Sequence, residues 1–264
     1  MSMRSLWTAA TGMSAQQTNM DVIANNLANA STTGFKSSRA NFEDLMYQTT
    51  VAPGAETSSS SQVPAGVQIG MGTRTSSVEK MFQQGNFTQT GNTLDLAIQG
   101  NGFFQVLQSG NNQQLFTRAG SFQTDQNGNI VDASGNMVQP QLTIPSTAVT
   151  ITISTTGMLT ATDATGKTVL SQQMHIYNFQ NPTGLQAVGQ NYFIQTESSG
   201  NVTDNPPGGT QGTGTILQGY LEASNVNVVN EMVNMILSQR SYEASSKVIK
   251  SADEMLQMAN NVVR

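Results

Sequence analysis

Side chains that perform acid–base or nucleophilic chemistry are sparse in this sequence and form no recognised catalytic motif. The single histidine, His175, falls in an expected strand over residues 174–179, where a histidine is usually structural. Ser14 lacks the G-x-S-x-G context of a nucleophile elbow. The chain has no cysteine, which excludes thiol catalysis and Cys-ligated metals. We therefore predict no catalytic residues and a protein that is not an enzyme.

Three segments resemble parts of ligand-binding motifs, and none is complete. Gly100-Asn101-Gly102 is followed by Gln105 where a dinucleotide loop has glycine, and no helix follows. The run 125–129 resembles half of a calcium loop without the later acidic ligand, so we interpret it as a hairpin turn. A histidine-based zinc site lacks its other ligands. We predict no cofactor and no metal. The acidic residues are scattered, and a carboxylate pair for sugar hydrolysis stays open because its spacing is set by the fold.

The composition narrows the class of protein. The 264 residues have a net charge of −5, and only 10% of them are charged, against roughly a quarter in ordinary soluble domains. Without a basic patch, nucleic acid is not an expected partner. No apolar run is long enough for membrane insertion, and residues 1–20 lack the apolar core of a cleavable signal peptide. A surface this poor in charge suits a protein covered by hydrogen-bonding neighbours; the alternative is an extracellular β-protein with a neutral polar coat.

A stripe of apolar residues runs through residues 226–264. Large apolar residues recur at every seventh position, and a small residue follows three positions later in most repeats. The large residues are Val228, Met235, Tyr242, Ile249, Leu256 and Val263, and the small ones are Ser238, Ser245, Ala252 and Ala259. No Pro or Gly interrupts the segment, which predicts one amphipathic helix of roughly 58 Å. A strict seven-residue repeat with small residues favours close, supercoiled packing.

The N-terminal segment has a shorter version of this repeat and predicts a helix over residues 3–30 that ends before Gly34. Matching stripes at both ends of the chain indicate that the terminal helices pair; the alternative is packing onto the chain's own globular core. Neither stripe can be fully buried within one chain, so we expect contacts between subunits to complete the burial. The residues of this assembly seam are Leu6, Met13, Met20, Leu27, Met235, Tyr242, Ile249 and Leu256.

The residues between the helices differ in character. Residues 41–47 fit a short helix or a strand, and residues 51–66, rich in Pro, Gly and Ser, fit either a flexible segment or an extended hairpin ordered by neighbouring subunits. Farther along, alternating runs such as Val149–Ile153 and frequent turn signals predict a barrel-like or sandwich-like module.

The predicted fold class is α+β with three regions. Long N- and C-terminal helices, over 1–34 and 225–264, form a coiled-coil-like terminal domain. An extended connecting region over 35–72 contains a long hairpin, and an all-β outer domain spans 73–224.

Several segments, in order along the chain, resemble the axial proteins of the bacterial flagellum, a family of rod and hook subunits. The similar segments are Asp21–Phe35, Gln99–Val106, Thr117–Phe122, Gln218–Val228 and Gln239–Glu243. The first contains the residues of the N-terminal family motif, namely Asn25, Asn26, Asn29, Gly34 and Phe35. The resemblance implies a structural subunit whose helices line a central channel and whose β-domain lies outside.

Within this family, the length and the insertion-like segment Tyr47–Gly72 are most similar to the subunits of the distal rod, since hook subunits are longer and lack the insertion. The implied function is to polymerise into a straight, rigid, hollow helical shaft that transmits torque from motor to hook. In that reading the insertion wedges between subunits and keeps the shaft straight. A proximal rod or hook subunit is one alternative, and a secreted peptidoglycan-binding or peptidoglycan-cleaving protein is another.

The resemblance also implies partners and a location. The partners are further copies of the chain, proximal rod proteins, the hook protein, the periplasmic and outer-membrane ring proteins that act as a bushing, and the flagellar type III export apparatus. The location is the basal body, from periplasm to outer membrane, reached without a cleaved signal peptide. Phe42 and Met46 have the spacing of a possible export-gate motif; the alternative is that Phe42 packs locally.

An acidic substitution in the assembly seam tests the packing hypothesis. Ile249→Asp would bury an unpaired charge, which is strongly unfavourable in a dry interface. We expect this variant to block assembly, so that electron microscopy shows no rods. Normal rods in the Ile249→Asp variant would contradict the hypothesis that these residues pack between subunits.

Overall fold

The computed structural model describes residues 2–54, 56–58, 61–62, 64–208 and 212–262, and it divides into two compact units. The helical unit comprises Met1–Ala28, Ser38–Lys80 and Asn227–Arg264. The β-unit comprises Asn29–Ser37 and Met81–Val226. The sequence-based boundaries lay after residues 34, 72 and 224, whereas the strands that follow the first helix group with the helices.

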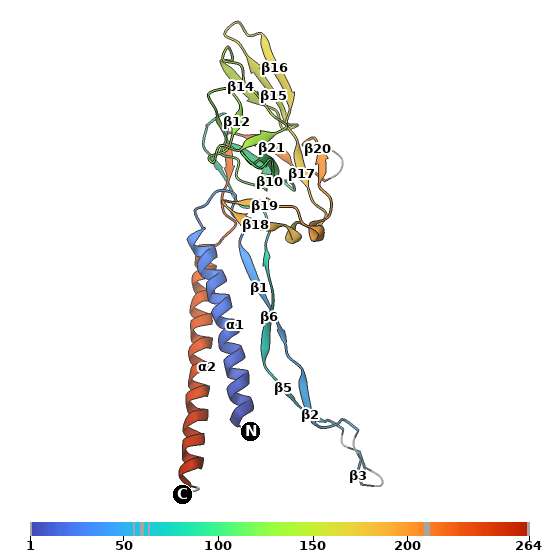
Figure 1. The fold of residues 1–264 in the computed structure, drawn as a ribbon, viewed down its shortest axis with the longest axis vertical. Helices are drawn as coiled ribbons and strands as arrows, with labels where there is room; N and C mark the ends of the chain where they lie inside the picture. Colours follow the sequence, from blue (N-terminus) through green and yellow to red (C-terminus); the bar gives the residue numbers. More distant parts are fainter. Residues whose placement is uncertain (1, 55, 59–60, 63, 209–211, 263–264) are drawn as a thin grey trace. The chain divides into compact units, whose positions relative to one another are not determined.

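The helical unit contains two long antiparallel helices, α1 (Ser2–Ala28) and α2 (Val228–Val262), which lie side by side (Figure 1). Asn19 Nδ2 donates to Ser238 Oγ at 2.8 Å, and Gly12 faces Ser245. The N-terminal and C-terminal helices are therefore confirmed.

A side-chain cap marks the start of α2. Asn227 Oδ1 accepts hydrogen bonds from the backbone N–H groups of Val229 (3.1 Å) and Asn230 (3.2 Å), as an N-cap does. Glu231 lies in the first turn, where a negative charge is favourable next to the helix N-terminus.

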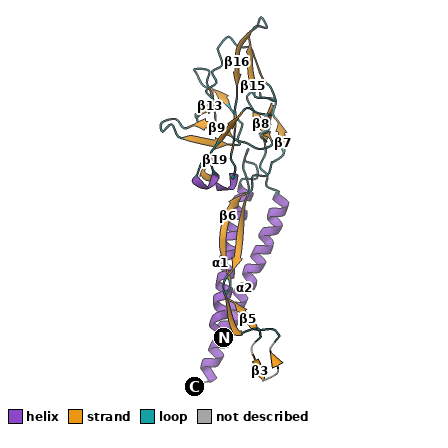
Figure 2. Ribbon diagram, turned by 90° about the vertical axis from the view of Figure 1, so that its right-hand side faces the viewer, coloured by secondary structure: helices purple, strands orange, loops and turns teal. Residues whose placement is uncertain are grey.

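A two-stranded antiparallel ribbon completes the helical unit (Figure 2). It pairs β1 (Ser38–Asp44) with β6 (Thr73–Lys80), and then β2 (Tyr47–Val51) with β5 (Val67–Gly70). Between them the short strands β3 (Glu56–Ser58) and β4 (Ser61–Gln62) also pair. The predicted helix-or-strand segment 41–47 is thus extended, and the ribbon lies in contact with α1.

Polar contacts fix the ribbon to α1. Thr11 Oγ1 accepts from the Thr73 N–H at 3.4 Å, and Arg4 Nη1 donates to Gln48 Oε1 at 2.7 Å. The intervening Gly72 has φ of +114°, and a Cβ there would lie 2.2 Å from Thr11 Oγ1. A glycine at this position therefore permits both the backbone conformation and the close approach.

The β-unit is built on a seven-stranded antiparallel sheet in the order β11-β12-β13-β9-β10-β19-β18. Its strands are β9 (Phe104–Leu107), β10 (Gln114–Thr117), β11 (Gln123–Thr124), β12 (Ile130–Val131), β13 (Met137–Gln139), β18 (Gln186–Gly189) and β19 (Tyr192–Ile194). A second sheet has the order β14-β15-β16, with bounds Thr150–Ile153, Met158–Thr162 and Thr168–Gln173.

Three further antiparallel pairs surround these sheets. They are β8 (Leu96–Gln99) with β21 (Thr215–Gln218), β7 (Phe87–Gln89) with β22 (Tyr220–Glu222), and β17 (Ile176–Asn178) with β20 (Thr203–Asn205). Two short 3-10 helices, η1 (Pro182–Gly184) and η2 (Glu197–Ser199), lie between strands. Because the expected strand at 149–153 is β14 and the expected turn at 127–128 joins β11 to β12, the β-rich middle of the chain is confirmed.

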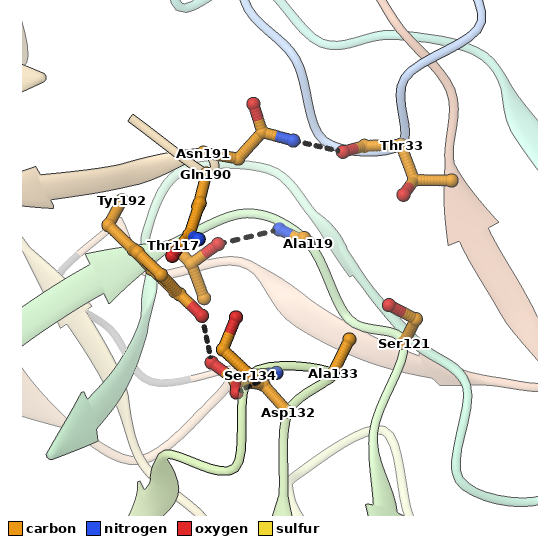
Figure 3. A pocket seen from close by; sticks show the side chains of 10 residues that line it. All are labelled: Thr33, Thr117, Ala119, Ser121, Asp132, Ala133, Ser134, Gln190, Asn191 and Tyr192. Atoms are coloured by element: carbon orange, nitrogen blue, oxygen red, sulfur yellow. Dashed lines mark hydrogen bonds between the residues drawn. The ribbon is translucent and has the colours of Figure 1, made fainter. Parts of the chain in front are cut away.

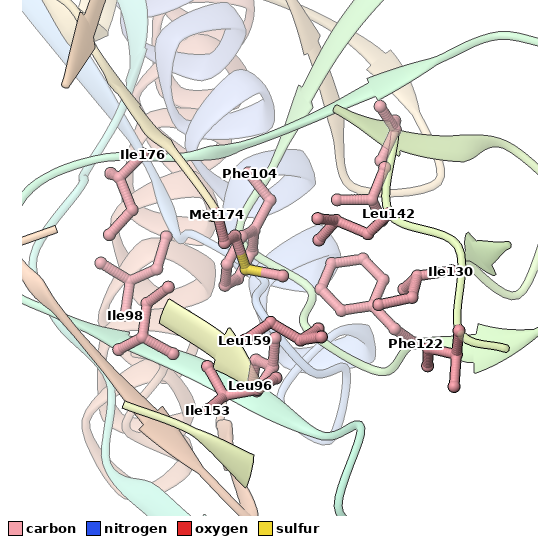
Figure 4. Close-up of a cluster of buried hydrophobic side chains, with 14 of the residues drawn as sticks. Leu96, Ile98, Phe104, Phe122, Ile130, Leu142, Ile153, Leu159, Met174 and Ile176 are labelled. Carbon is pink, nitrogen blue, oxygen red and sulfur yellow. The ribbon is translucent and has the colours of Figure 1, made fainter. Parts of the chain in front are cut away.

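Two buried clusters form the core of the β-unit. The larger cluster is mostly aliphatic and includes Leu96, Ile98, Phe104, Leu159 and Ile176 (Figure 4). The smaller cluster is aromatic, and its rings meet edge to face: Phe103 lies 5.7 Å from Phe179, and Phe116 lies 6.0 Å from Tyr177. Edge-to-face rings add favourable quadrupole contacts to the burial of apolar area.

Tyr177 makes the stability of the β-unit sensitive to alkaline pH. Burial, together with the nearby Asp204 carboxylate, raises the pKa of Tyr177 to about 12. In the unfolded chain the Tyr177 phenol loses its proton near pH 10. The free energy of unfolding is therefore at its full value below pH 10 and falls as the pH rises from 10 to 12. Between pH 9 and pH 11.5 we expect Tyr177→Phe to reduce that loss by roughly 2 kcal/mol, at about 1.4 kcal/mol per pH unit above 10. Denaturant unfolding at pH 9 and pH 11.5 measures the difference. The half-buried Tyr220→Phe is the control, and equal alkaline losses in the wild type and Tyr177→Phe would contradict the assignment.

Candidate assembly surface

Small residues occupy the contact between α1 and α2. Asn19 Nδ2 of α1 bonds to the buried Ser238 of α2, and the other buried residues of the two helices include Ala9, Ala15, Ile23 and Ala252. A Cβ built on Gly12 would lie 3.7 Å from Ser245 Oγ, an ordinary van der Waals distance. Side chains of this size let the two helix backbones approach closely.

The large residues of the predicted seam are less completely buried. Six are half-buried, namely Leu6, Met13, Met20, Leu27, Met235 and Ile249. Tyr242 and Leu256 are exposed. One helix pair therefore leaves much of this apolar surface accessible, and further burial requires another surface.

A second apolar surface, which the seven-residue pattern did not include, lies on the first turns of α2. We call it the outer patch; its residues are Val229, Met232, Val233, Ile236 and Leu237, all exposed. Ile236 and Leu237 are 57% and 59% exposed. The spacing of 229, 232, 233 and 236 places these side chains on one helix face. This spacing was visible in the sequence, but the longer repeat beside it dominated the interpretation.

The outer patch ends where charged residues begin. Farther along α2, exposed side chains include Arg240, Glu243, Lys247 and Lys250. Arg240 Nη1 lies 3.2 Å from Glu243 Oε2, an exposed ion pair of small energetic value. The single tryptophan, Trp7 of α1, is also exposed, at 69%. Contiguous exposed apolar side chains of this kind mark sites of protein association.

The five residues of the family motif are in different environments. Asn25 is exposed on α1, whereas Asn26 is buried. Asn26 Nδ2 donates to Ser38 O, and its Oδ1 accepts from the Ser38 N–H, both at 2.8 Å. The side-chain amide therefore pairs with the backbone as a neighbouring strand would, and this fixes the start of β1.

The other three motif residues lie in the β-unit. Asn29 Oδ1 accepts from Thr32 Oγ1 at 3.2 Å, and Phe35 is buried. Gly34 has φ of +70°, and a Cβ on it would lie 2.5 Å from the Ala119 backbone nitrogen. The motif therefore has structural roles on this chain.

The two residues with the export-gate spacing lie on or beside the ribbon. Phe42 belongs to β1, where the register with β6 shifts, and it is 38% exposed. Met46 follows β1 and is 86% exposed. Neither side chain is locked in a core, so both are accessible.

The β-unit has a polar pocket of about 250 Å³ (Figure 3). Asp132 is its acidic residue, and the carboxylate accepts hydrogen bonds from Tyr192 Oη and from the N–H groups of Ser134 (2.9 Å) and Asn136 (3.0 Å). Asn136 Nδ2 also donates to this carboxylate, at 3.3 Å, so four donors hold Asp132 in the wall of the pocket. His175 is not among the residues that line this pocket; its Nδ1 lies 2.6 Å from Asp204 Oδ1.

No helix in the described part of the chain combines the length and the apolar character needed to cross a membrane. Among the same residues, His, Asp and Glu side chains form no group of three that could hold a metal ion.

Comparison with known proteins accounts for most of the chain. Residues 6–36 match the family of flagella basal body rod proteins, residues 97–161 the flagellar hook protein FlgE/F/G D1 domain, and residues 217–262 the flagellar basal body rod FlgEFG protein C-terminal family. The flagellar basal-body rod protein FlgG of Buchnera aphidicola subsp. Schizaphis graminum is 48% identical over 256 residues, 96% of this chain and 97% of the relative.

The extent of the similarity differs between a rod protein and a hook protein. FlgG of Caulobacter vibrioides is 45% identical over 262 residues, which cover 98% of this chain and 99% of the relative. The flagellar hook protein FlgE of Helicobacter mustelae is 42% identical over 137 residues, only 52% of this chain and 30% of the relative. The similarity to rod proteins therefore extends over the whole chain, whereas the similarity to this hook protein is partial.

The outer patch is tested by one acidic substitution. Because Ile236 is exposed in the single chain, we expect Ile236→Asp to leave the thermal stability of the monomer within about 0.5 kcal/mol. The same change should prevent self-association, since it would bury an unpaired charge between subunits. Trp7, as the single tryptophan, reports the association through its fluorescence, which should shift to shorter wavelength only in chains that polymerise.

The matched control is Ser251→Asp, which adds the same charge to an exposed site on α2 beyond the outer patch. This variant should associate like the wild type. Normal association of Ile236→Asp would show that the outer patch stays exposed in the assembly.

Proposed function

This chain belongs to the FlgG family of flagellar basal-body rod proteins, and we propose that its copies polymerise into a straight, rigid, hollow shaft that transmits torque from the motor to the hook. It is a structural subunit of the distal rod. The observation that best supports polymerisation is the apolar surface that one chain leaves uncovered on α1 and α2. Head-to-tail contacts repeated from copy to copy build an open helix of this kind.

In the polymer, the paired helices would form a coiled-coil-like terminal domain that lines the central channel. The small residues in the α1–α2 contact support tight pairing within one subunit. The half-buried seam residues and the outer patch would then pack against neighbouring subunits. The low content of charged residues, 10%, agrees with a surface that neighbours cover.

The ribbon is the part of the subunit that we assign to rigidity. An isolated two-stranded hairpin is only marginally stable in water. Several of its apolar side chains are exposed, including Tyr47, Val67 and Ile69. A ribbon clamped between subunits would gain the burial it lacks and would resist bending of the shaft.

Partners and route of export follow from the same assignment. The shaft would contact the proximal rod proteins, the hook protein, and the periplasmic and outer-membrane ring proteins around it. The subunit would reach the basal body through the flagellar type III export apparatus without cleavage of a signal peptide. Accessible Phe42 and Met46 suit recognition at an export gate.

Deletion of Gln48 to Ala65 tests the role of the ribbon. The deletion removes most of β2 and leaves β1 and β6, which hold the rest of the ribbon on α1. We expect rods to form and to lose straightness, as electron microscopy of isolated basal bodies would measure.

The double substitution Thr49→Ala and Thr50→Ala is the control, because it keeps the β2 backbone while removing two exposed hydroxyl side chains. Its rods should remain straight. Deletion rods as straight as the wild type, or no rods at all, would contradict the assignment.

A further inference from the structure

The chain passes between the segments of its two units four times, after residues 28, 37, 80 and 226. Inside the β-unit, residues next to these passages come together at one buried point, which we call the Glu222 node. Its members are Gly34, Lys36, Ser37, Met81, Gln83, Gly85, Arg118, Glu222 and Asn225. The node therefore contains residues next to three of the four passages, and Gly34 belongs to the short segment that begins at the fourth.

Glu222 is the centre of the node and is 1% exposed. Its Oε1 lies 2.6 Å from Lys36 Nζ and accepts from the Gly85 N–H at 2.9 Å. Its Oε2 lies 3.2 Å from Arg118 Nη1, and its backbone carbonyl accepts from the Gly34 N–H at 2.8 Å. Glu222 thus binds four groups from three separate segments of the chain.

The two cations of the node are themselves buried. Lys36 Nζ also donates to the Gln83 carbonyl at 2.8 Å, and Arg118 Nη2 donates to the Gly100 carbonyl at 2.8 Å. Burial lowers the pKa of Lys36, and the Glu222 carboxylate opposes this effect. The Arg118 guanidinium lies 5.4 Å above the Phe103 ring. Removing the carboxylate would leave two buried positive charges without their counter-ion, which is strongly destabilising.

Asn225 closes the node with one carboxamide. Its Oδ1 accepts from the Ser37 N–H at 2.8 Å, and its Nδ2 donates to the Met81 carbonyl at 2.8 Å and the Gln83 carbonyl at 3.2 Å. The Met81 N–H donates in turn to the Ser37 carbonyl at 2.8 Å. The side chain therefore links three of the four passages directly.

We propose that the Glu222 node is a force-transmitting joint, in which Glu222 and Asn225 lock the four passages so that they move as one body under load. This inference rests on the proposed function. Four separate linkers would each rotate about their backbone torsions and would absorb a twist. Passages that share one buried carboxylate and one carboxamide cannot rotate independently, because such movement breaks hydrogen bonds to Glu222 or to Asn225.

The sequence segments that resemble the flagellar axial family supply Gly34, Arg118, Glu222 and Asn225 of the node. Gly34 lies in the segment Asp21–Phe35 and Arg118 lies in Thr117–Phe122, while Gly100, whose carbonyl accepts from Arg118, lies in Gln99–Val106. Glu222 and Asn225 both belong to Gln218–Val228. The node thus gives a physical reason for the co-occurrence of segments that are far apart in the chain.

Amide hydrogen exchange on the purified full chain tests whether the node is one cooperative body. In Asn225→Ala, we expect the N–H groups of Gly34, Ser37, Met81 and Gly85 to lose protection together, by at least about tenfold, as in sub-global opening. The amides of β9 and β10 should keep theirs. Asn225→Asp keeps the oxygen that accepts from the Ser37 N–H but loses the donors to the Met81 and Gln83 carbonyls. It replaces the alanine variant if that variant folds poorly, and the same amides should lose protection together.

The exposed Asn111→Ala, in the loop between β9 and β10, is the matched control and should change none of these rates. If only Ser37 loses protection in the Asn225 variants, the contacts are independent and the joint is disproved.

The mechanical role is tested by motility under load. Cells with Asn225→Asp should build straight rods and swim like the wild type in dilute medium, but they should lose speed disproportionately in viscous medium. A loss of speed that is the same at low and high viscosity would indicate a merely structural role and would overturn the proposal. Failure of the wild-type chain to form rods would count against the proposed function and would leave the exchange result unaffected.

Discussion

The close packing of two helices through small side chains is the constraint on which the rest of this structure depends. Gly12 meets Ser245 and Asn19 meets Ser238 where α1 and α2 pack, and Gly and Ser side chains fill little volume. The large apolar residues of the repeat therefore lie at the edges of the contact, where a single chain buries them only in part. A subunit built in this way lowers its free energy by association, which is the physical basis for a polymer.

The β-unit follows a different rule. Its aliphatic and aromatic clusters are complete within the chain, and Phe104, Phe116 and Ile176 are fully buried there. Such a core does not need a neighbour. The molecule thus combines one unit with a complete core and one unit that leaves apolar side chains exposed.

Hydrogen bonds and ion pairs of polar side chains hold separate chain segments together where there is little apolar packing. Asn26 pairs with the backbone of Ser38, and Glu222 binds Lys36 and Arg118 out of contact with water. These contacts are directional, so they fix the register of chain segments in a way that apolar packing alone does not. Asn26, Arg118 and Glu222 lie in segments that resemble the flagellar axial family, and the structure shows which groups each of these side chains binds.

The sequence by itself determined the two terminal helices, the β-rich middle and the family, because these depend on local periodicity and on residue order. The seven-residue repeat was sufficient for α1 and α2, and alternation was sufficient for β14. Strands without clean alternation, such as β16 (Thr168–Gln173), were not predicted. Only the tertiary structure decided that the ribbon groups with the helices, that Val229 to Leu237 expose a second apolar face, and that Lys36, Arg118 and Glu222 meet. Such features depend on contacts between residues up to 186 positions apart, which local pattern does not encode.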